Sequence, residues 1–357
     1  MIYLSLLILL VLMIPLKKNR IRLITKSVTV EDIVFYLIVA LMLLICSLRS
    51  VDVGKDTRMY YRLFERAKAL SSLEHYLSTF SYFEYGYWIL NFIFAKYLNF
   101  QSLLALIGAL SILPAAYVIK QYSKDKIISL ILYIGFPFFT FSMQALRQAP
   151  AIGMVLLAYD AMKKKKLTRY LLFCLLAFFF HTSAILFLPA YWIGKLPYKK
   201  WMKWLVPAFI ILSFALKSQI QTIILTYARS HYATEDAGGY RMFAFILLTV
   251  VLGMIYRRYL ADPDDLGTDW NELFFFQVIV AMMWPISSFN PAVSRMYYYY
   301  QVFLALFVPQ LTSNIQQKTV RIAIHAGYIF VSFFFLIYYQ LPAFYKLEPY
   351  SFFWQIG

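Results

Sequence analysis

The chain has 357 residues, of which 62% are apolar and only 14% are charged. Its formal net charge of +17 comes from cations that separate apolar stretches at short-loop intervals, a distribution that argues against a nucleic-acid-binding surface. The composition excludes an ordinary soluble domain and indicates an integral membrane protein.

The first apolar run, residues 2–16, is expected to remain as a helix. A signal peptide places basic residues before its apolar core, whereas here the basic cluster follows the run. This order favours a retained membrane helix over a cleaved leader.

Apolar runs separated by basic turns predict an all-α polytopic protein in which residues 1–357 form one membrane domain. A helix that crosses the bilayer needs about 20 apolar residues, so several runs are short and their ends can shift. The run at 168–194 is interpreted as two short helices that break near His181. With that run counted twice, about 12 transmembrane spans are predicted, at residues 2–16, 32–48, 101–119, 127–143, 149–162, 168–194, 204–216, 242–256, 272–289, 296–311 and 322–341.

The distribution of charge orients these helices. Alternation from an external N-terminus places most of the 34 Lys and Arg residues in cytoplasmic loops, as the positive-inside rule requires. If residues 168–194 crossed only once, Lys195, Lys199 and Lys203 would fall outside, against the rule. The charges therefore favour two crossings there and both termini outside.

Residues 49–100 form the longest polar interval and are predicted to be a large external loop between helices 2 and 3. Residues 85–100 within it are mostly apolar, which is typical of an interfacial or re-entrant helix. Aromatic residues of the loop either form an interfacial belt or offer faces on which sugars stack. Six cations here lie on the side where cations are scarce, which suggests an anionic partner: Arg49, Lys55, Arg58, Arg62, Arg66 and Lys68.

Two arginines lie in short turns predicted to be external. Arg147 precedes a helix that begins near Pro150, and a guanidinium beside free helix N–H groups is suited to binding phosphate oxygens. The alternative is a flanking residue that snorkels to the interface. Arg295, in the turn at 289–295, either binds the same kind of anion or a sugar, or anchors the interface beside Tyr297.

Acids and imidazoles that can take a proton are few on the predicted outer side. Asp56 and Glu84 either accept a proton or hold a sugar hydroxyl, and Asp56 can equally pair with Lys55 or Arg58. His181 is expected to act as a general base, to bind a diphosphate, or to pin the helix break. We expect no metal or cofactor, because no metal-ligand cluster or phosphate-binding glycine-rich loop is present.

Four short motifs occur in a fixed order along the chain. They are residues 53–60 (VGKDTRMY), residues 84–87 (EYGY), Arg147 with Gln148, and residues 181–184 (HTSA). Together they resemble the ordered motifs of EpsG-type, Wzy-like polysaccharide polymerases. The resemblance covers about residues 51–189, with a weaker match at 290–297. The order of the four motifs along the chain is what carries the resemblance.

The resemblance implies a polymerase at the outer face of the bacterial cytoplasmic membrane that joins repeat units carried on undecaprenyl diphosphate. It would build an exopolysaccharide, capsule or O-antigen, with a flippase and a chain-length regulator as partners and no nucleic acid. The sugar, the linkage and the stereochemical course stay open. The catalytic candidates are Arg147, His181, Asp56 and Glu84. The substrate-binding candidates are Arg58, Tyr60, Tyr87, Gln148, Arg295 and Tyr297.

Two other functions are compatible with the sequence. A flippase or exporter of lipid-linked oligosaccharide would also use internal cations, but would not need a large external loop with acids. A membrane acyltransferase would use His181 as its base, but that residue would have to be reached from the cytoplasm. For the polymerase, the basic segment at 49–68 is predicted to gather the anionic substrate while Arg147 makes the catalytic contact.

Overall fold

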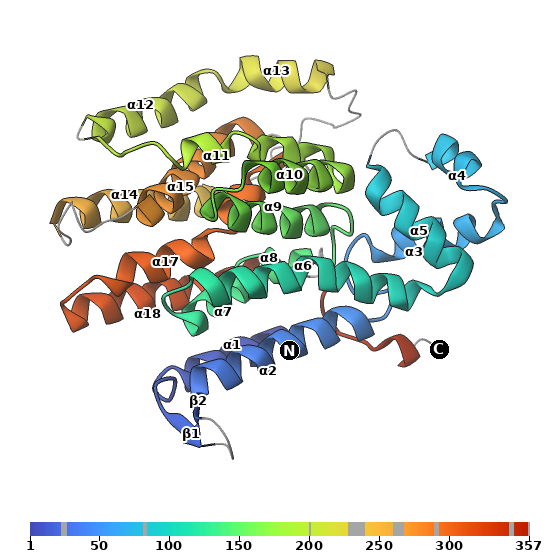
Figure 1. Cartoon of the computed structure of the whole chain (residues 1–357), viewed down its shortest axis with the longest axis horizontal. Helices are drawn as coiled ribbons and strands as arrows, with labels where there is room; N and C mark the ends of the chain where they lie inside the picture. The colour runs from blue at the N-terminus through green and yellow to red at the C-terminus, as the bar shows by residue number, and fades with distance from the viewer. Residues whose placement is uncertain are drawn as a thin grey trace. The chain divides into compact units, whose positions relative to one another are not determined.

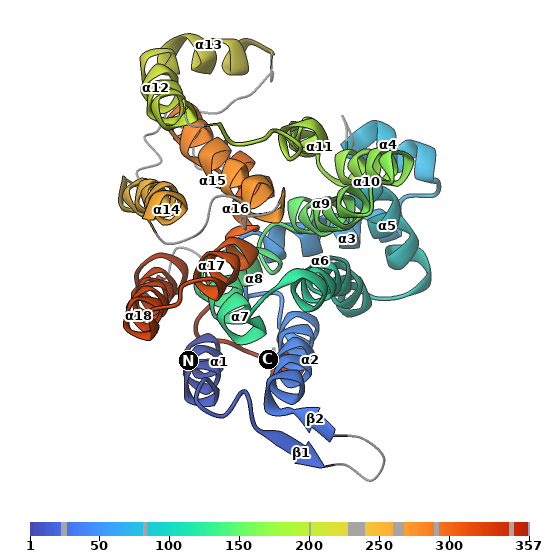
Figure 2. The same cartoon turned by 60° about the vertical axis from the view of Figure 1, so that its left-hand side comes forward.

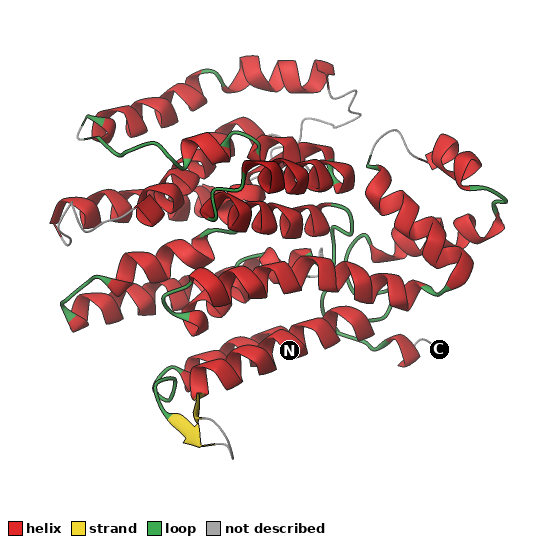
Figure 3. Ribbon diagram, in the orientation of Figure 1, coloured by secondary structure: helices red, strands yellow, loops and turns green. Residues whose placement is uncertain are grey.

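The computed structural model describes residues 1–22, 27–80, 84–199, 201–227, 240–259, 268–288, 293–342 and 346–355. Nearly all of its regular structure is helical, which confirms the predicted all-α class (Figure 3). Within the described residues, the strands are a short antiparallel hairpin of β1 (Arg20–Arg22) and β2 (Ser27–Thr29). Contacts divide the chain into two compact units, Met1–Ile185 with Ile322–Gly357, and Leu186–Arg321.

The first unit is built on a row of adjacent helices. Its longer helices are α1 (Ile2–Met13), α2 (Val30–Leu48), α6 (Phe100–Tyr122), α7 (Lys126–Gly135), α9 (Gln148–Lys163), α10 (Leu167–Phe180) and most of α18 (Lys318–Phe335). The helix α2 packs on α6, α6 on α9, and α9 on α10 (Figures 1 and 2). Because consecutive helices alternate in direction, each end of the row collects turns that lie far apart in the sequence.

Large apolar side chains cover much of the outer surface of this unit. Leu172, Leu175 and Phe179 on α10 are exposed, as are Leu37 and Leu44 on α2. An exposed apolar surface of this extent is unfavourable in water and favourable against lipid. The chain is therefore a membrane protein.

Among the described residues, three helical stretches are long and apolar enough to cross a bilayer: Val30–Leu48, Phe100–Tyr122 and Lys318–Gln340, the last being α18 continued by the π-helical turn η3 (Leu336–Gln340). A bent pair, α12 (Met202–Ala215) with α13 (Lys217–Tyr227), would make a fourth, with an angle of 60° at its break. The number of crossings predicted from the sequence stays a prediction.

Two predicted spans are interrupted, and one predicted break is confirmed. The run at 127–143 was expected to be one helix, but α7 ends at Gly135 and a short helix, α8 (Phe138–Phe141), follows. The reason is Pro137, which disfavours helical backbone at the preceding residue. The run at 296–311 is divided among η2 (Val293–Tyr297), α16 (Tyr298–Gln301) and α17 (Leu304–Ser313). The break near His181 is confirmed, because α10 ends at Phe180 and His181 is extended.

One end of the first unit gathers paired charges near the hairpin. Lys126 Nζ lies 2.8 Å from an Asp32 carboxylate oxygen, and Lys17 forms an ion pair with Asp125. Asp125 also caps α7 by accepting a hydrogen bond from the backbone of Ile128. We call this the charged end. Because the helices alternate in direction, the start of α2, the end of α6 and the turn between α9 and α10 all lie at the charged end.

The second unit packs around one long apolar helix. Its further helices are α11 (Ala190–Ile193), α14 (Tyr240–Tyr259) and α15 (Thr268–Ser287). The helix α15 contacts α12, α14 and α17 and buries Trp270, Phe274 and Phe276. The first residues of the unit join this core, since Phe187 stacks on Phe303 with ring centroids 5.7 Å apart.

The segment at 49–100 folds into three helices, α3 (Thr57–Ala69), α4 (Leu73–Phe80) and α5 (Tyr85–Tyr97). They lie at the end of α2 and α6 opposite the hairpin (Figure 1). The helix α3 is amphipathic: it buries Tyr60 and Phe64 against α5 and α6 and exposes Arg58, Arg62 and Arg66. The predicted helix at 85–100 is present as α5, while its interfacial or re-entrant position stays a prediction.

The turn before α3 is pinned to the turn before α9 through one carbonyl. Met143 O accepts hydrogen bonds from Arg49 Nη2 at 3.2 Å and from Thr57 Oγ1 at 3.1 Å. Gly54 has φ +99° in the same turn, and a Cβ there would lie 2.6 Å from Thr57 Oγ1 and still closer to Met143 O. Arg49 is fully buried, so it does not share in the attraction of an anionic partner that was predicted for the six cations of this segment.

We expect Gly54→Ala to lower the stability of the protein by about 1–3 kcal/mol, because the added methyl group meets backbone at a positive φ. The matched control is Gly327→Ala in α18, where a Cβ meets nothing within 4 Å and alanine favours the helix. Thermal unfolding of both purified variants in detergent measures the difference. Equal melting temperatures would contradict the packing described for the turn.

Candidate functional site

Three residues from three predicted motifs meet at the end of the first unit opposite the charged end. Glu84 immediately precedes α5, Arg147 immediately precedes α9, and His181 immediately follows α10. The helix α10 packs against both α5 and α9, which brings these helix ends together. Backbone groups at helix ends lack hydrogen-bond partners within the helix, so such ends can offer polar groups to a ligand.

The carboxylate of Glu84 joins the other two side chains. Its Oε2 accepts a hydrogen bond from Arg147 Nη1 at 2.5 Å. Its Oε1 forms an ion pair with His181 Nδ1 and lies 3.4 Å from the backbone N–H of Thr182, which donates to it. The Glu84 side chain is only 8% exposed, whereas those of Arg147 and His181 are 35% and 25% exposed. One buried carboxylate thus orients a cation and an imidazole that both remain accessible.

The contacts among Glu84, Arg147 and His181 determine the protonation states of Glu84 and Arg147. Burial acts to raise the pKa of Glu84, but the hydrogen bond to His181 and the positive charge of Arg147 outweigh it, so the pKa is lowered. Burial acts to lower the pKa of Arg147, but Tyr60 and Glu84 raise it overall. Glu84 is therefore ionised and Arg147 protonated at neutral pH. A carboxylate with a lowered pKa is a weak base, which fits an orienting role.

Arg147 is held on two further sides. Its Nε donates to the Tyr60 hydroxyl at 3.1 Å, and its guanidinium carbon lies 5.9 Å from the centre of the Trp88 ring. Burial raises the pKa of Tyr60, so the hydroxyl stays neutral and can accept this bond. A guanidinium has five N–H groups, and these contacts use two of them. The Nη2 group makes no hydrogen bond to any residue that the structure describes, so it is available to a ligand.

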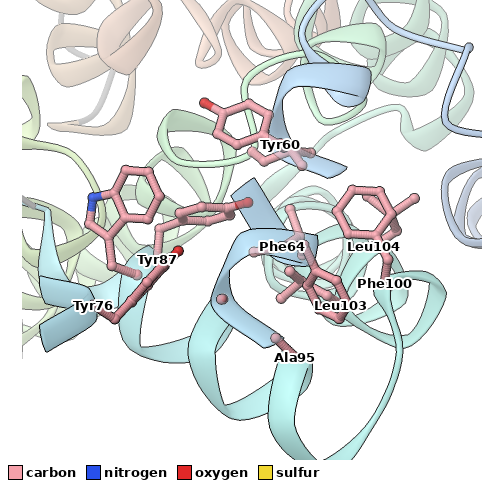
Figure 4. Close-up of a cluster of buried hydrophobic side chains, with 12 residues drawn as sticks. Tyr60, Phe64, Tyr76, Tyr87, Ala95, Phe100, Leu103 and Leu104 are labelled. Carbon is pink, nitrogen blue, oxygen red and sulfur yellow. The ribbon is translucent and has the colours of Figure 1, made fainter. Parts of the chain in front are cut away.

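A buried aromatic cluster packs against Tyr60, the residue that accepts a hydrogen bond from Arg147. Figure 4 shows the rings of Tyr60 and Tyr87 next to one another, with centroids 5.1 Å apart in an edge-to-face arrangement. Asn91 donates to the Tyr87 hydroxyl at 3.4 Å. Tyr87 was expected to contact substrate, but it is fully buried and offers no open face to a sugar. In the structure Tyr87 has a packing role: its ring contacts the ring of Tyr60 and so helps to hold the Tyr60 hydroxyl next to Arg147.

The EYGY motif has a conformation that explains its residues. Glu84 has φ 68° and ψ 41°, a left-handed backbone that costs a non-glycine residue about 1–2 kcal/mol. A Cβ at Gly86 would lie 3.1 Å from the carbonyl oxygen of Phe179, so glycine lets α5 approach the end of α10. This approach is what places the Glu84 carboxylate against His181.

Other predicted residues lie around the cluster rather than in it. Asp56 is the N-cap residue of α3, and its carbonyl accepts a hydrogen bond from the Tyr60 backbone at 3.1 Å. Gln148 is the first residue of α9 and is buried. Arg58 is exposed and its Nε donates to Asp52 at 2.7 Å, so its ion-pair partner is Asp52.

Arg295 and Tyr297 belong to the second unit, where both lie in η2. Arg295 is half-buried and Tyr297 is buried, with the Tyr298 ring centroid 5.1 Å from its own. Residues 289–292 of the predicted turn, including Asn290 in the weaker motif match, lie outside the described residues.

Sequence reasoning missed two partners of the cluster. Trp88 lies only four residues after Glu84, and this short separation was the available signal. The backbone N–H of Thr182 gave no such signal. In the described part of the chain, no group of three or more His, Cys, Asp or Glu residues is placed to hold a metal ion.

Comparison with known proteins gives one family. The model of the EpsG family matches residues 32–352. No curated protein and no solved structure matches the chain. The matched range is most of the 357 residues and contains Glu84, Arg147 and His181. The chain therefore belongs to the EpsG family.

Proposed function

We propose that this protein is a glycosyltransferase that polymerises bacterial surface polysaccharide, such as exopolysaccharide, capsule or O-antigen. It would transfer a glycan chain from undecaprenyl diphosphate to a sugar hydroxyl of a lipid-linked repeat unit. Membership of the EpsG family supports a polymerase-like role in polysaccharide biosynthesis. The observation that carries the proposal is the Arg147–Glu84–His181 cluster, in which one carboxylate orients a phosphate-binding group and a proton acceptor.

The proposed orientation in the membrane follows from the two ends of the first unit. The charged end contains Lys17, Lys126 and Lys164, and positively charged turns favour the cytoplasmic side. The Arg147–Glu84–His181 cluster lies at the opposite helix ends and is therefore proposed to face the outside. We propose about 12 crossings of the cytoplasmic membrane, with residues 49–100 as the external segment.

The transfer breaks the bond between the anomeric carbon of the donor glycan and the diphosphate oxygen. The diphosphate leaves with the bonding electron pair, and the acceptor hydroxyl oxygen forms the new glycosidic bond. Arg147 would stabilise the negative charge that develops on the leaving diphosphate, through N–H groups that Tyr60 and Glu84 leave available. Prior alignment by these two partners spares the arginine reorganisation during the reaction.

The acceptor hydroxyl must lose its proton as the new bond forms. His181 presents Nδ1 to Glu84, so its Nε2 is the nitrogen that would take this proton. The Glu84 carboxylate holds the imidazole in that tautomer and stabilises the imidazolium that forms, as carboxylates do for catalytic histidines. Asp56, one helical turn before Tyr60, is proposed to hold a sugar hydroxyl.

The exposed face of α3 is proposed to gather the substrate. Arg58, Arg62 and Arg66 are spaced four residues apart and all three are exposed, so they form one basic stripe. Such a stripe attracts an anionic lipid diphosphate over about the Debye length of 8–10 Å. Gln148, Arg295 and Tyr297 stay predictions from the sequence, and a flippase and a chain-length regulator are proposed as partner proteins.

The proposal is tested with purified protein in liposomes supplied with undecaprenyl-diphosphate oligosaccharide. We expect a ladder of longer glycans on a gel. Movement of labelled lipid-linked sugar across the vesicle without chain growth would overturn the proposal in favour of a flippase. Transfer of an acyl group to the glycan would overturn it in favour of an acyltransferase.

A further inference from the structure

A cavity lies in the first unit, at the charged end and away from the Arg147–Glu84–His181 cluster. It has a volume of about 390 Å³ and is formed where α6, α9 and α10 meet at the α9–α10 turn. This volume lies within the range of about 300–1,000 Å³ that is usual for small-molecule sites. The residues that line it are Tyr117, Leu157, Asp160, Ala161, Lys164, Lys166, Arg169, Leu172 and Phe173.

One wall of the cavity is positively charged. The single carboxylate of its lining, Asp160, accepts hydrogen bonds from Tyr117 at 3.1 Å and Tyr122 at 2.7 Å and pairs with Lys164 at 2.9 Å. These contacts neutralise it. Among the residues that the structure describes, no carboxylate lies within ion-pair distance of Lys166 or Arg169. Their two charges are therefore available to an anion.

The start of α10 adds to this wall. The helix begins at Leu167, its N-cap residue is Lys166, and no side chain caps its first turn. The first backbone N–H groups of a helix have no acceptor within the helix, and the helix dipole there favours negative charge. The first turn of α10 and the two cations thus favour the same kind of ligand.

The other wall is apolar and reaches the outer surface. Leu157 and Phe173 are half-buried, and Leu172 is 52% exposed on the face of α10 that carries Leu175. In a membrane protein this surface faces lipid. The cavity therefore joins an anion-binding wall to an apolar wall that continues towards the bilayer.

We propose that this cavity binds the headgroup of an anionic phospholipid. The phosphate would lie between Lys166, Arg169 and the first turn of α10, and an acyl chain would lie along Leu172 and Phe173. A soluble anion would leave the apolar wall uncovered, and a zwitterionic headgroup would bring a further cation next to the lysines. Basic cavities between transmembrane helices are suited to anionic headgroups for these reasons. Such a site goes beyond the proposed polymerase activity, since it lies at the other helix ends.

The test uses the purified full-length protein and measures lipid binding by native mass spectrometry and by thermal unfolding. We expect phosphatidylglycerol to bind at least about tenfold more tightly than phosphatidylcholine and to raise the melting temperature. In Lys166→Ala/Arg169→Ala this preference should be lost. Lys199→Ala/Lys203→Ala removes the same charge from the next basic turn and should retain the preference. Arg169→Gln alone, a milder change at an exposed position, should reduce it.

Three results would overturn the proposal. Equal binding of the two lipids by the wild-type protein would show that the cavity does not recognise an anionic headgroup. Equal loss of preference in the Lys199→Ala/Lys203→Ala control would show attraction to charge in general. Displacement of phosphatidylglycerol by millimolar inorganic phosphate would assign the cavity to a soluble anion.

Discussion

Arg147→Ala is expected to lower the rate of glycan chain growth by about 10²–10³-fold, the usual effect of removing one preorganised group that stabilises developing negative charge. The side chain is charged, partly exposed and aligned by Tyr60, Glu84 and Trp88, so its loss removes the proposed contact to the leaving diphosphate. The rate is measured from the glycan ladder formed by purified protein in liposomes.

Arg147→Lys distinguishes the shape of the group from its charge. A lysine keeps the positive charge but cannot bond Tyr60, Glu84 and a phosphate from one planar group, so we expect a rate at least about tenfold below wild type. Lys203→Ala, an exposed cation in the second unit, is the control and should keep the wild-type rate. Full activity of Arg147→Lys, with its melting temperature unchanged, would mean that any nearby cation suffices.

His181→Ala and Glu84→Ala are each expected to slow chain growth by about 10²-fold or more, within the range usual for loss of a general base. His181 is the proposed proton acceptor, and Glu84 orients it through Nδ1. Glu84→Gln keeps the shape but removes the charge, and should fall between Glu84→Ala and wild type. A wild-type rate for His181→Ala would exclude the imidazole as the base.

The coupling between these residues is the sharper measurement. Because Glu84 acts through Arg147 and His181, adding Glu84→Ala to Arg147→Ala should slow chain growth by a smaller factor than Glu84→Ala does alone. Fully additive effects would mean that Glu84 contacts the substrate independently. Glu84→Ala should also lower the melting temperature, since it leaves a partly buried guanidinium without its carboxylate.

Long apolar runs made the helical class and several helix boundaries predictable. The predicted spans at 32–48 and 101–119 agree with α2 and α6 to within three residues. The break at His181 was predictable because a polar residue interrupts an apolar run that is longer than one membrane-spanning helix needs. The break at Pro137 was missed, although a proline inside a run is a local signal that the preceding residue leaves the helix.

The candidate residues of the site were predictable one by one, but their mutual contacts were not. Glu84 and Arg147 are 63 positions apart, and their contact depends on how α5, α9 and α10 pack. Hydropathy also cannot separate an exposed cation from one that is buried against carbonyl groups. Arg49 shows this, since it was counted among the cations that attract an anionic partner and instead donates a hydrogen bond to Met143 O.

The exposed face of α3 shows the opposite case. Its cations at positions 58, 62 and 66 alternate with apolar residues at helical spacing, so the amphipathic pattern was present in the sequence. That pattern identifies which side of the helix faces solvent without any knowledge of the packing. The residues that pack against the buried side of α3 could be identified only from the structure, in which the Tyr60 hydroxyl accepts a hydrogen bond from Arg147.

The binding of undecaprenyl diphosphate, the product that leaves in the proposed reaction, tests the role of Arg147 most directly. Its affinity is measured by thermophoresis with purified protein in nanodiscs. The wild type and Lys203→Ala are predicted to bind alike, and Arg147→Lys and Arg147→Ala to bind at least about tenfold more weakly. Equal affinity of all four proteins would contradict the assignment of the diphosphate to the Arg147–Glu84–His181 cluster.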